Sequence, residues 1–337
     1  MKRLLILGGT LIEPGEIREV HLPITEAANS RPVLLPITVI RGRNEGLCVL
    51  LTAAVHGDEL NGTAILRELL EVITDVELFG SLIIVPIVNI LGFLSRSRYL
   101  PDRRDLNRFF PGSPTGNMTE RVAHRFFENV CKMADVILDF HTAGHGRENY
   151  PHIRADMENP LVRKYAKTFG TPIILDDKGA KGTLRRAATD HGIPAIVFEG
   201  GTADTFQKSI VKAGVSGLLR FLERTGMIKK EKTKKKFPFH VVVKRTQWIR
   251  AERGGILELK IHPGNLLYRG DPVAQISNPL GKEVHLLPSP HTGLVIGVTT
   301  SPVVNPGMPV AHVAQLQKTL STIERAISSK TLKPLKL

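Results

Sequence analysis

Four short, continuously apolar runs constrain the fold of this chain more than any other feature. The runs lie at residues 47–54, 81–88, 136–140 and 195–198, and helical patterns lie between them at 61–73 and 120–133. Runs without polar alternation are typical of strands buried on both faces. We therefore expect an α/β fold with a mixed, mostly parallel sheet and helices on both faces. In such sheets, functional side chains gather where strands end and loops begin.

The character of the sequence changes near residue 230. A helical pattern at 209–225 ends at Gly226, and six lysines follow within residues 229–236. Beyond them, short strand patterns punctuated by Gly and Pro predict a small all-β barrel or sandwich. These patterns lie at 239–243, 255–260, 272–277 and 293–298. We predict a first domain at 1–230, a β-barrel or sandwich domain at 231–317, and a basic C-terminal tail at 318–337.

Composition narrows the function without choosing it. A net charge of +14 can attract nucleic acid, an anionic membrane or acidic small molecules. Aromatic residues make up only 5% of the chain, which argues against stacking on bases. Two cysteines exclude a disulfide framework and a Cys-rich metal site. We find neither a signal-peptide pattern nor an apolar run of about 18 residues, so we expect a cytoplasmic protein without membrane partners.

Two histidines and one glutamate form a candidate metal site. His56 and Glu59 follow the first apolar run and are three residues apart, so both can face one point on a tight turn or helix start. His141 follows the third run. Two histidines and one carboxylate, with a position left for water, are a known ligand set for catalytic zinc. A His-x-x-Glu pair alone is weak in a chain with 12 histidines, and its placement after a strand strengthens it.

Two further segments carry polar groups suited to catalysis. Arginines with an amide beside them crowd residues 95–112 after the second run, and such groups can grip a carboxylate in bidentate fashion. A solvated basic loop would explain any one of these arginines but not the cluster. Glu199 follows the fourth run, where a carboxylate is either buried or at the mouth of a site, and burial would bring its pKa toward that of a base.

Four ordered motifs together resemble a known family. They are HGDE, RDLNRFFPG, DFHTA and FEGG. The combination resembles the succinylglutamate desuccinylase/aspartoacylase family of zinc carboxypeptidase-like proteins, over nearly the whole chain and including a C-terminal β domain. The resemblance implies one Zn²⁺ per chain.

The resemblance also implies roles for single residues. Its metal ligands fall on His56, Glu59 and His141, and its general acid/base falls on Glu199. The Asn-Arg pair that binds the substrate carboxylate falls on Asn107 and Arg108, and a carboxylate that orients the first histidine falls on Asp105. The arginine that polarises the scissile carbonyl falls on Arg98 in preference to Arg96.

Several other residues do not have a clear counterpart in the pattern of this family. His145 follows His141 by four residues and could compete for the metal, but His141 follows the strand directly. Arg185 is a candidate for selecting the acyl group or side chain, and a solvated surface arginine is an equally good reading. We interpret the other histidines as surface or satisfied structural residues; they include His124, His152, His191, His262 and His312.

These observations predict a zinc-dependent hydrolase that cleaves the amide bond of a small acidic N-acyl amino acid by a metal-activated water. The alternative within the same class is a zinc carboxypeptidase acting on peptide C-termini. A protein that binds nucleic acid or other anions through its basic surface would leave the four motifs unexplained, so we expect no nucleic-acid partner. A homo-oligomer is compatible with the sequence. The sequence does not specify which acyl group and amino acid the substrate contains, which metal is bound in the cell, or what the β domain does.

Overall fold

The computed structural model describes residues 4–229, 240–316 and 319–335. A large mixed sheet runs through it in the order β12-β19-β17-β8-β10-β7-β5-β6-β4-β3, with β9 beside β8, β11 beside β9 and β14 beside β17. Its N-terminal strands are β3 (Ile17–Glu26), β4 (Pro32–Arg41), β5 (Asn44–Ala53), β6 (Phe79–Val85), β7 (Val136–His141), β8 (Arg147–Ala155), β9 (Ile173–Asp176) and β10 (Ala195–Gly201). A hairpin of β1 (Ile6–Leu7) and β2 (Thr10–Leu11) lies outside this sheet.

The centre of the sheet is parallel. β5 pairs in parallel with β6 and with β7, and β7 pairs in parallel with β10. The carboxyl ends of β5, β7 and β10 therefore meet at one edge, and all three are among the apolar runs found in the sequence. The strands β3 and β4, which pair antiparallel beyond β6, have no counterpart in our sequence-based expectations.

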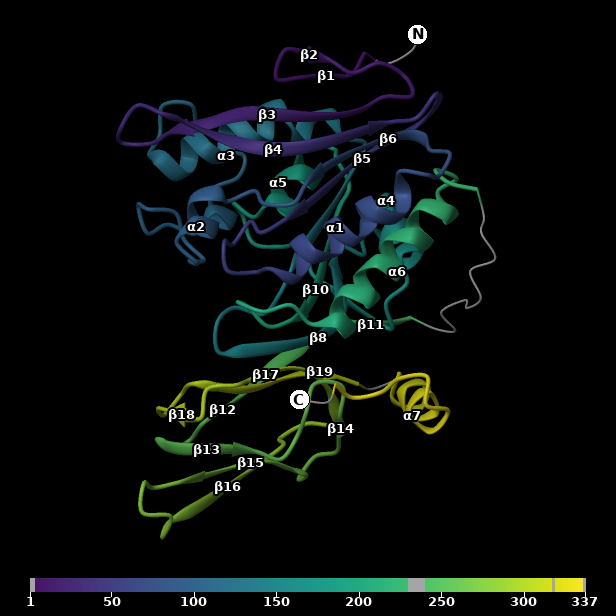
Figure 1. Ribbon diagram of the computed structural model, residues 1–337. Helices are drawn as coiled ribbons and strands as arrows, with labels where there is room; N and C mark the ends of the chain where they lie inside the picture. Colours follow the sequence, from purple (N-terminus) through teal and green to yellow (C-terminus); the bar gives the residue numbers. More distant parts are fainter. Residues whose placement is uncertain (1–3, 230–239, 317–318, 336–337) are drawn as a thin grey trace.

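Helices cover both faces of this sheet (Figure 1). One face packs against α1 (Asn61–Ile73), α4 (Pro160–Phe169) and α6 (Lys208–Arg224), and the other against α3 (Met118–Asn129) and α5 (Leu184–Asp190). On β5, Val49 and Leu51 join the first core while Cys48 and Leu50 join the second. Because both faces of β5 are buried, the strand is continuously apolar. A short helix, α2 (Ile90–Leu94), and a 3-10 turn, η1 (Leu106–Arg108), follow β6.

The C-terminal part is built from β-strands, as predicted, and extends the main sheet. Antiparallel pairing of β17 with β8 joins the two parts, with Thr299 opposite Arg147. A separate sheet has the order β16-β15-β13-β18 and encloses a third apolar core with β12, β17 and β19. Figure 1 shows these strands below β8. They are β12 (Thr246–Arg250), β13 (Gly255–Leu259), β14 (Leu266–Leu267), β15 (Pro272–Ser277), β16 (Val284–Pro288), β17 (Gly293–Thr299), β18 (Val303–Val304) and β19 (Pro309–Gln315).

The fold class predicted from the sequence is thus confirmed: a mixed α/β sheet with helices on both faces, followed by a C-terminal β region. β11 (Val241–Val243) differs from the expectation, because it pairs in parallel with β9 of the N-terminal part. The helix α7 (Leu320–Ser328) lies in the segment predicted as a tail. The lysine-rich boundary lies mostly in residues 230–239, outside the described residues, so the division into domains stays a prediction. Within the described ranges, we find no helix long and apolar enough to span a bilayer.

Candidate active site

The loop after β5 brings His56 and Glu59 into the interior. Ala54 turns the chain at a φ of 48°, and the following residues lie directly against α2. The contact is close at Gly57, where a Cβ would lie 2.0 Å from the carbonyl carbon of Gly92. Only glycine fits there without moving the backbone, and this explains the glycine of the HGDE motif.

His56, Glu59 and His141 converge at the carboxyl ends of β5 and β7. The Nδ1 atom of His56 lies 2.7 Å from Oε1 of Glu59, and Nδ1 of His141 lies 2.9 Å from Oε2. One ligand atom from each residue lies within 4.8 Å of the others. The three residues are 4%, 1% and 4% exposed. Side chains far apart in the sequence therefore meet in one buried cluster.

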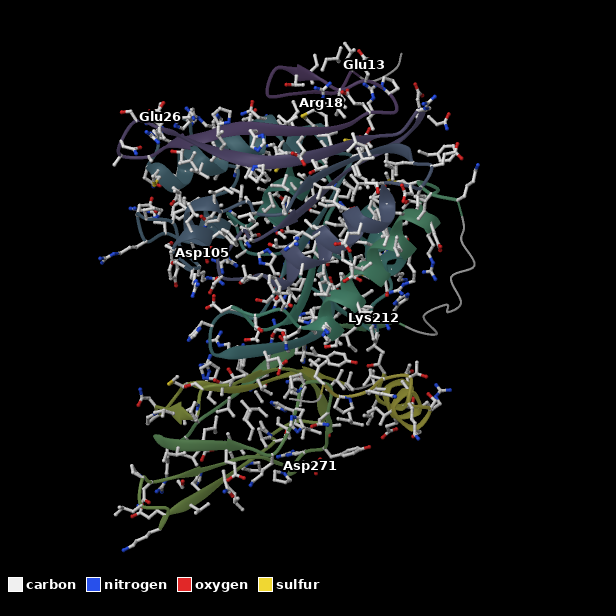
Figure 2. All side chains as sticks on the ribbon, viewed as in Figure 1. Glu13, Arg18, Glu26, Asp105, Lys212 and Asp271 are labelled. Atoms are coloured by element: carbon white, nitrogen blue, oxygen red, sulfur yellow. The ribbon has the colours of Figure 1, made fainter. Side chains whose placement is uncertain are left out.

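A second carboxylate holds the far side of each imidazole. Nε2 of His56 lies 3.0 Å from Asp105, and Nε2 of His141 lies 2.8 Å from Asp139. Thr52 in turn donates a hydrogen bond of 2.7 Å to Asp139. Figure 2 labels Asp105 at the level of the loops that follow α2. Asp105 contacts His56, the histidine that the resemblance assigned to it, and its orienting role stays a prediction. We did not anticipate Asp139, although residues two apart on a strand share a face.

This arrangement fits a divalent cation. A neutral imidazole that donates Nε2–H to an outer carboxylate keeps a lone pair on Nδ1. Both Nδ1 atoms then face acceptor oxygens of Glu59, and these acceptors repel one another unless a proton or a cation lies between them. Two neutral imidazoles and one carboxylate are also the donors that zinc takes in catalytic sites.

The charges within the cluster shift the pKa values of its members strongly. Burial by itself would raise the pKa of Glu59, but the two imidazoles outweigh burial and hold this pKa well below its ordinary value. Burial would lower the pKa of His141, but Asp139 and Glu59 outweigh it and raise this pKa well above its ordinary value. Opposing burial in the same way, Glu59 and Asp105 raise the pKa of His56. The cluster therefore holds positive charge around an ionised Glu59.

Arg98 lies beside this cluster. Its Nη1 donates to Oε1 of Glu59 at 3.2 Å, and its Nη2 donates to Oδ2 of Asp105 at 2.9 Å. Arg96, the other candidate, is exposed and does not line the same pocket. His145 is 89% exposed at its side chain and lies 4.0 Å from Asp204, away from the cluster. The structure thus brings Arg98 to the cluster and leaves Arg96 and His145 outside it.

Asn107 and Arg108 lie on η1, which Asp105 caps. Oδ1 of Asp105 accepts a hydrogen bond of 2.9 Å from the Asn107 backbone N–H, in addition to its contact with His56. Oδ1 of Asn107 accepts from the backbone N–H of Leu184 at 2.8 Å and thereby ties η1 to α5. Arg108 is exposed, and its Nη1 donates to the Asn107 carbonyl oxygen at 2.8 Å. Both side chains line the pocket described below.

Glu199 lies on β10 directly opposite His141 of β7 in the parallel register. Asn149 donates a hydrogen bond of 3.1 Å to its Oε2, and Nε of Arg154 lies 3.4 Å from its Oε1. Both partners lie on β8, a strand that our reading of the sequence did not identify. Glu199 is partly buried and lines the same pocket as the cluster.

These groups line one pocket of about 480 Å³. Its far wall comes from the C-terminal β region: Trp248 of β12 stacks on His312 of β19, with ring centroids 4.6 Å apart and planes 7° apart. The guanidinium carbon of Arg147 lies 5.2 Å from the Trp248 ring centroid. Burial first, and then Arg154 and Arg147, lower the pKa of His312 to about 3, so this imidazole is neutral. We interpreted His312 as structural, and the pocket includes it.

Comparison with known proteins identifies the family. The family model described as the succinylglutamate desuccinylase/aspartoacylase catalytic domain matches residues 45–225, which is more than half of the chain. The chain belongs to this family. The match begins within β5 and ends after α6, so it includes every predicted site residue. The resemblance noted from the four motifs is thereby confirmed.

Individual relatives agree with this assignment. The chain is 30% identical over 257 residues to the N-alpha-acetyl-L-2,4-diaminobutyric acid deacetylase of Halomonas elongata, covering 72% of this chain and 74% of that protein. The product-bound ectoine utilization protein EutE (DoeB) from Ruegeria pomeroyi matches with a TM-score of 0.79 and 27% identity, covering 90% of this chain and 97% of that one. A succinylglutamate desuccinylase/aspartoacylase from Rhodobacter sphaeroides matches with a TM-score of 0.77 and 27% identity, covering 88% and 94%.

Proposed function

We propose that this family member is a zinc-dependent deacylase that hydrolyses the amide bond of a small N-acyl amino acid. The observation that carries the proposal is the convergence of His56, Glu59 and His141 in one pocket with Glu199. The relative from Halomonas elongata, named as a deacetylase of an N-acetyl amino acid, supports the same reaction class.

In this proposal, His56, Glu59 and His141 hold one zinc ion per chain. When bound, zinc polarises a water molecule and the scissile carbonyl group. Asp105 and Asp139 keep both histidines in the tautomer that presents Nδ1 to the metal. The buried position of the cluster strengthens each of these electrostatic interactions.

The remaining steps are assigned to residues of the chain. Glu199 accepts a proton as the water oxygen attacks the amide carbon, and it returns that proton to the nitrogen as the carbon–nitrogen bond breaks. The products are a carboxylate and a free amine. Proton transfer by a positioned carboxylate typically contributes about 10²–10⁴ in rate. Asn149 and Arg154 hold the Glu199 carboxylate toward the pocket.

Two further groups position the substrate. Arg98, already beside Glu59, donates a hydrogen bond to the carbonyl oxygen as negative charge develops on it. Asn107 and Arg108 bind the carboxylate of the amino acid, which fixes the amide bond beside the cluster. The hydrogen bond from the backbone N–H of Leu184 to Asn107 connects this carboxylate-binding pair to α5.

The size of the pocket favours a deacylase over a carboxypeptidase. A volume of about 480 Å³ suits a small molecule, and Trp248 and His312 of the C-terminal β region form part of its wall. A peptidase needs a groove that is open to a peptide chain. A carboxypeptidase would share the same ligands and arginines, so the choice between the two rests on this wall and on the relatives.

One experiment tests the proposal directly. The purified protein is analysed for metal and assayed with N-acetyl and N-succinyl amino acids alongside dipeptides. We expect about one zinc per chain and hydrolysis of N-acyl amino acids in preference to dipeptides. Glu199→Gln should retain zinc and lose at least about 10²-fold in kcat. Near-normal turnover by this variant would refute the role of Glu199, and preferential cleavage of dipeptides would favour the carboxypeptidase.

A further inference from the structure

Gln207 connects three segments that surround the candidate site. It directly precedes α6 and is partly buried. Its side-chain Oε1 accepts two hydrogen bonds, one of 3.1 Å from Nδ2 of Asn61 and one of 2.8 Å from the backbone N–H of Thr202. Its Nε2 donates a hydrogen bond of 2.7 Å to Oε1 of Glu148, and its backbone N–H donates one of 2.7 Å to Oδ1 of Asn61. One residue therefore joins three segments that are distant in the sequence.

Each of the three partners is close in the sequence to a residue of the candidate site. Asn61 is the first residue of α1 and follows Glu59 by two positions. Thr202 comes after β10 and follows Glu199 by three positions. Glu148 lies on β8, directly before the asparagine that donates a hydrogen bond to Glu199. The network therefore links the segment that carries a candidate metal ligand to the two segments that place Glu199.

The network lies behind the pocket and not in its wall. Asn61 and Glu148 are buried, and within the described part of the chain the pocket lining includes none of the four residues Asn61, Glu148, Thr202 and Gln207. The Oε2 atom of Glu148 has no hydrogen-bond partner among the described residues, so the contact with Gln207 orients this carboxyl group. Buried polar networks of this kind stiffen the structure around them.

The glycine at position 201 is explained by the same network. Gly201 has a φ of 78°, and a Cβ there would lie 2.1 Å from Oε1 of Gln207 and 2.7 Å from Nδ2 of Asn61. A side chain at this position would push the two amides apart. The carbonyl oxygen of Gly201 also accepts a hydrogen bond of 3.1 Å from the backbone N–H of Ala143, which follows His141 by two positions. The end of β10 is thus bonded to the loops that carry both candidate histidine ligands or their glutamate neighbour.

We propose that Gln207 is a positioning residue that holds the Glu199 carboxylate at a fixed place relative to the His56, Glu59 and His141 cluster. This inference rests on the proposed function, in which Glu199 transfers the proton. Glu199 and the cluster come from different elements, so their separation depends on the contacts between those elements. A misplacement of about 1 Å can cost about 10²-fold in rate, even when the substitution is far from the reacting atoms.

The first test is Gln207→Leu, which removes the side-chain hydrogen bonds at similar volume. In the zinc-loaded, full-length variant we expect kcat for an N-acyl amino acid to fall about 10–100-fold. KM should be unchanged, because the groups that bind the substrate are intact. Metal analysis and a thermal melt report whether the variant is loaded and folded at the assay temperature. A purely structural role would lower the melting temperature and leave kcat at the wild-type value, and that result would overturn the inference.

The chain offers a matched control for this substitution. Gln275 donates a hydrogen bond of 2.6 Å to Glu258 between two strands of the separate C-terminal sheet, outside the pocket. This pair has the same chemistry as the pair of Gln207 and Glu148, but both of its side chains are exposed or half-buried. Gln275→Leu should therefore retain the wild-type kcat and KM.

The second test is Gln207→Glu, which keeps an acceptor for Asn61 and Thr202 but replaces the donor that faces Glu148 with a carboxyl oxygen. Two adjacent carboxyl groups share a proton when one is neutral and repel each other when both are ionised. Burial already raises the pKa of Glu148, while Gln207 and the charge of His262 oppose this rise. The kcat of the variant should therefore approach that of the wild type as the pH falls and drop below it as the pH rises.

A reciprocal exchange provides the rescue. Gln207→Glu combined with Glu148→Gln reverses donor and acceptor, so the hydrogen bond forms again without a second carboxylate. We expect this double variant to recover most of the wild-type kcat and to lose the added pH dependence. Gln275→Glu, beside Glu258, is the control for the introduced charge. A ratio of kcat values that does not change with pH in Gln207→Glu, or an exchange that restores nothing, would contradict the positioning role.

The inference and the proposed function fail in different ways. Hydrolysis by the wild type together with a wild-type kcat in folded Gln207→Leu would remove the positioning role and leave the deacylase intact. If the wild type hydrolyses no N-acyl amino acid, the proposed function fails, and a crystal structure of Gln207→Leu decides the positioning role. We expect the Glu199 carboxylate to be displaced relative to His141, and an unmoved carboxylate would overturn the inference. If Gln207→Leu does not fold, Gln207→Glu and the reciprocal exchange decide instead.

Discussion

At the scale of single residues, each of the two imidazoles in the site lies between two carboxylates. Glu59 lies between the two histidines, while Asp105 and Asp139 hold their outer nitrogens. Each ring is thus fixed in orientation, with Nδ1 toward Glu59 and Nε2 toward its outer carboxylate. Such outer partners commonly contribute one or two orders of magnitude to metal affinity.

Asp139→Asn tests this support at the histidine whose partner we did not anticipate. Loss of the Asp139 charge makes His141 a weaker donor and leaves its tautomer unfixed. We expect zinc affinity to fall about 10–100-fold, measured by competition with a chelator of known affinity. Asp190→Asn, which alters an exposed pair with Arg186, is the control. Wild-type affinity in Asp139→Asn would show that the outer carboxylate does not tune the metal site.

His152 makes the stability of the protein depend on pH. Burial, followed by the charge of Arg154, lowers its pKa from 6.5 to about 3. The unfolded chain therefore binds a proton that the folded protein rejects between these values. The contribution to stability is complete above pH 6.5 and is lost as the pH falls toward 3, by at most about 1.4 kcal/mol per pH unit.

The measurement is the free energy of unfolding in urea at several pH values between 6.5 and 4. The wild type should lose stability more steeply than His152→Asn, which cannot take up this proton. Parallel slopes for the two proteins would contradict the assignment of the effect to His152.

The residues predicted for the candidate site lie mostly in short sequence motifs. Other residues that line the pocket lie outside these motifs and were not predicted. His56, Glu59 and His141 lie in short motifs that directly follow apolar strands, so their convergence followed from strand ends meeting at one edge. Arg147 and Arg154 lie on β8, whose sequence mixes charged and aromatic residues because one side of it lines the pocket. No local pattern marks such a strand. The contacts of Trp248 and His312 with the pocket depend on pairing between distant segments.

At the scale of elements, the site depends on tight connections after the parallel strands. The helix predicted at 61–73 is α1, and the strand predicted at 272–277 is β15. Continuous apolar runs and helical spacing predict such elements because the pattern itself reflects burial. The antiparallel strands β3 and β4 at the edge were not predicted, since each contains a proline and exposes much of one face.

Gly57→Ala tests the connection after β5. The new methyl group would overlap the backbone of Gly92, and backbone at α2 has to move to make room. We expect the free energy of unfolding to fall by about 1–3 kcal/mol, with weaker zinc binding because His56 is adjacent. Gly254→Ala is the control, since the nearest atoms to its new methyl group lie 3.4 Å away. Equal losses in urea denaturation of the two variants would refute this steric account.

At the scale of the whole molecule, the C-terminal β region completes the pocket. Trp248 and His312 belong to strands of the extended sheet, and Arg147 reaches Trp248 from β8. The C-terminal β region, which the sequence predicts as a separate domain, thus contributes residues to the candidate site. Its chemical contribution is a neutral, flat surface beside a group of arginines.

Trp248→Ala tests the wall. Removal of the indole opens the pocket and removes the partner of the Arg147 guanidinium, so short N-acyl substrates should lose about tenfold in kcat/KM. Substrates with larger acyl groups should gain relative to them. A series of acyl lengths measures both effects. Phe206→Ala, which removes an exposed aromatic side chain outside the pocket, should leave the acyl-length profile unchanged. An unchanged profile in Trp248→Ala as well would show that the wall does not select substrates.

The ladder between β8 and β17 has a mechanical consequence. Opposite walls of the pocket are cross-linked by backbone hydrogen bonds of one continuous sheet, so swinging the C-terminal region outward would require that ladder to rupture. The positions of Trp248 on β12 and His312 on β19 relative to Arg147 on β8 are therefore set by backbone pairing through β17, and not by side-chain contacts alone.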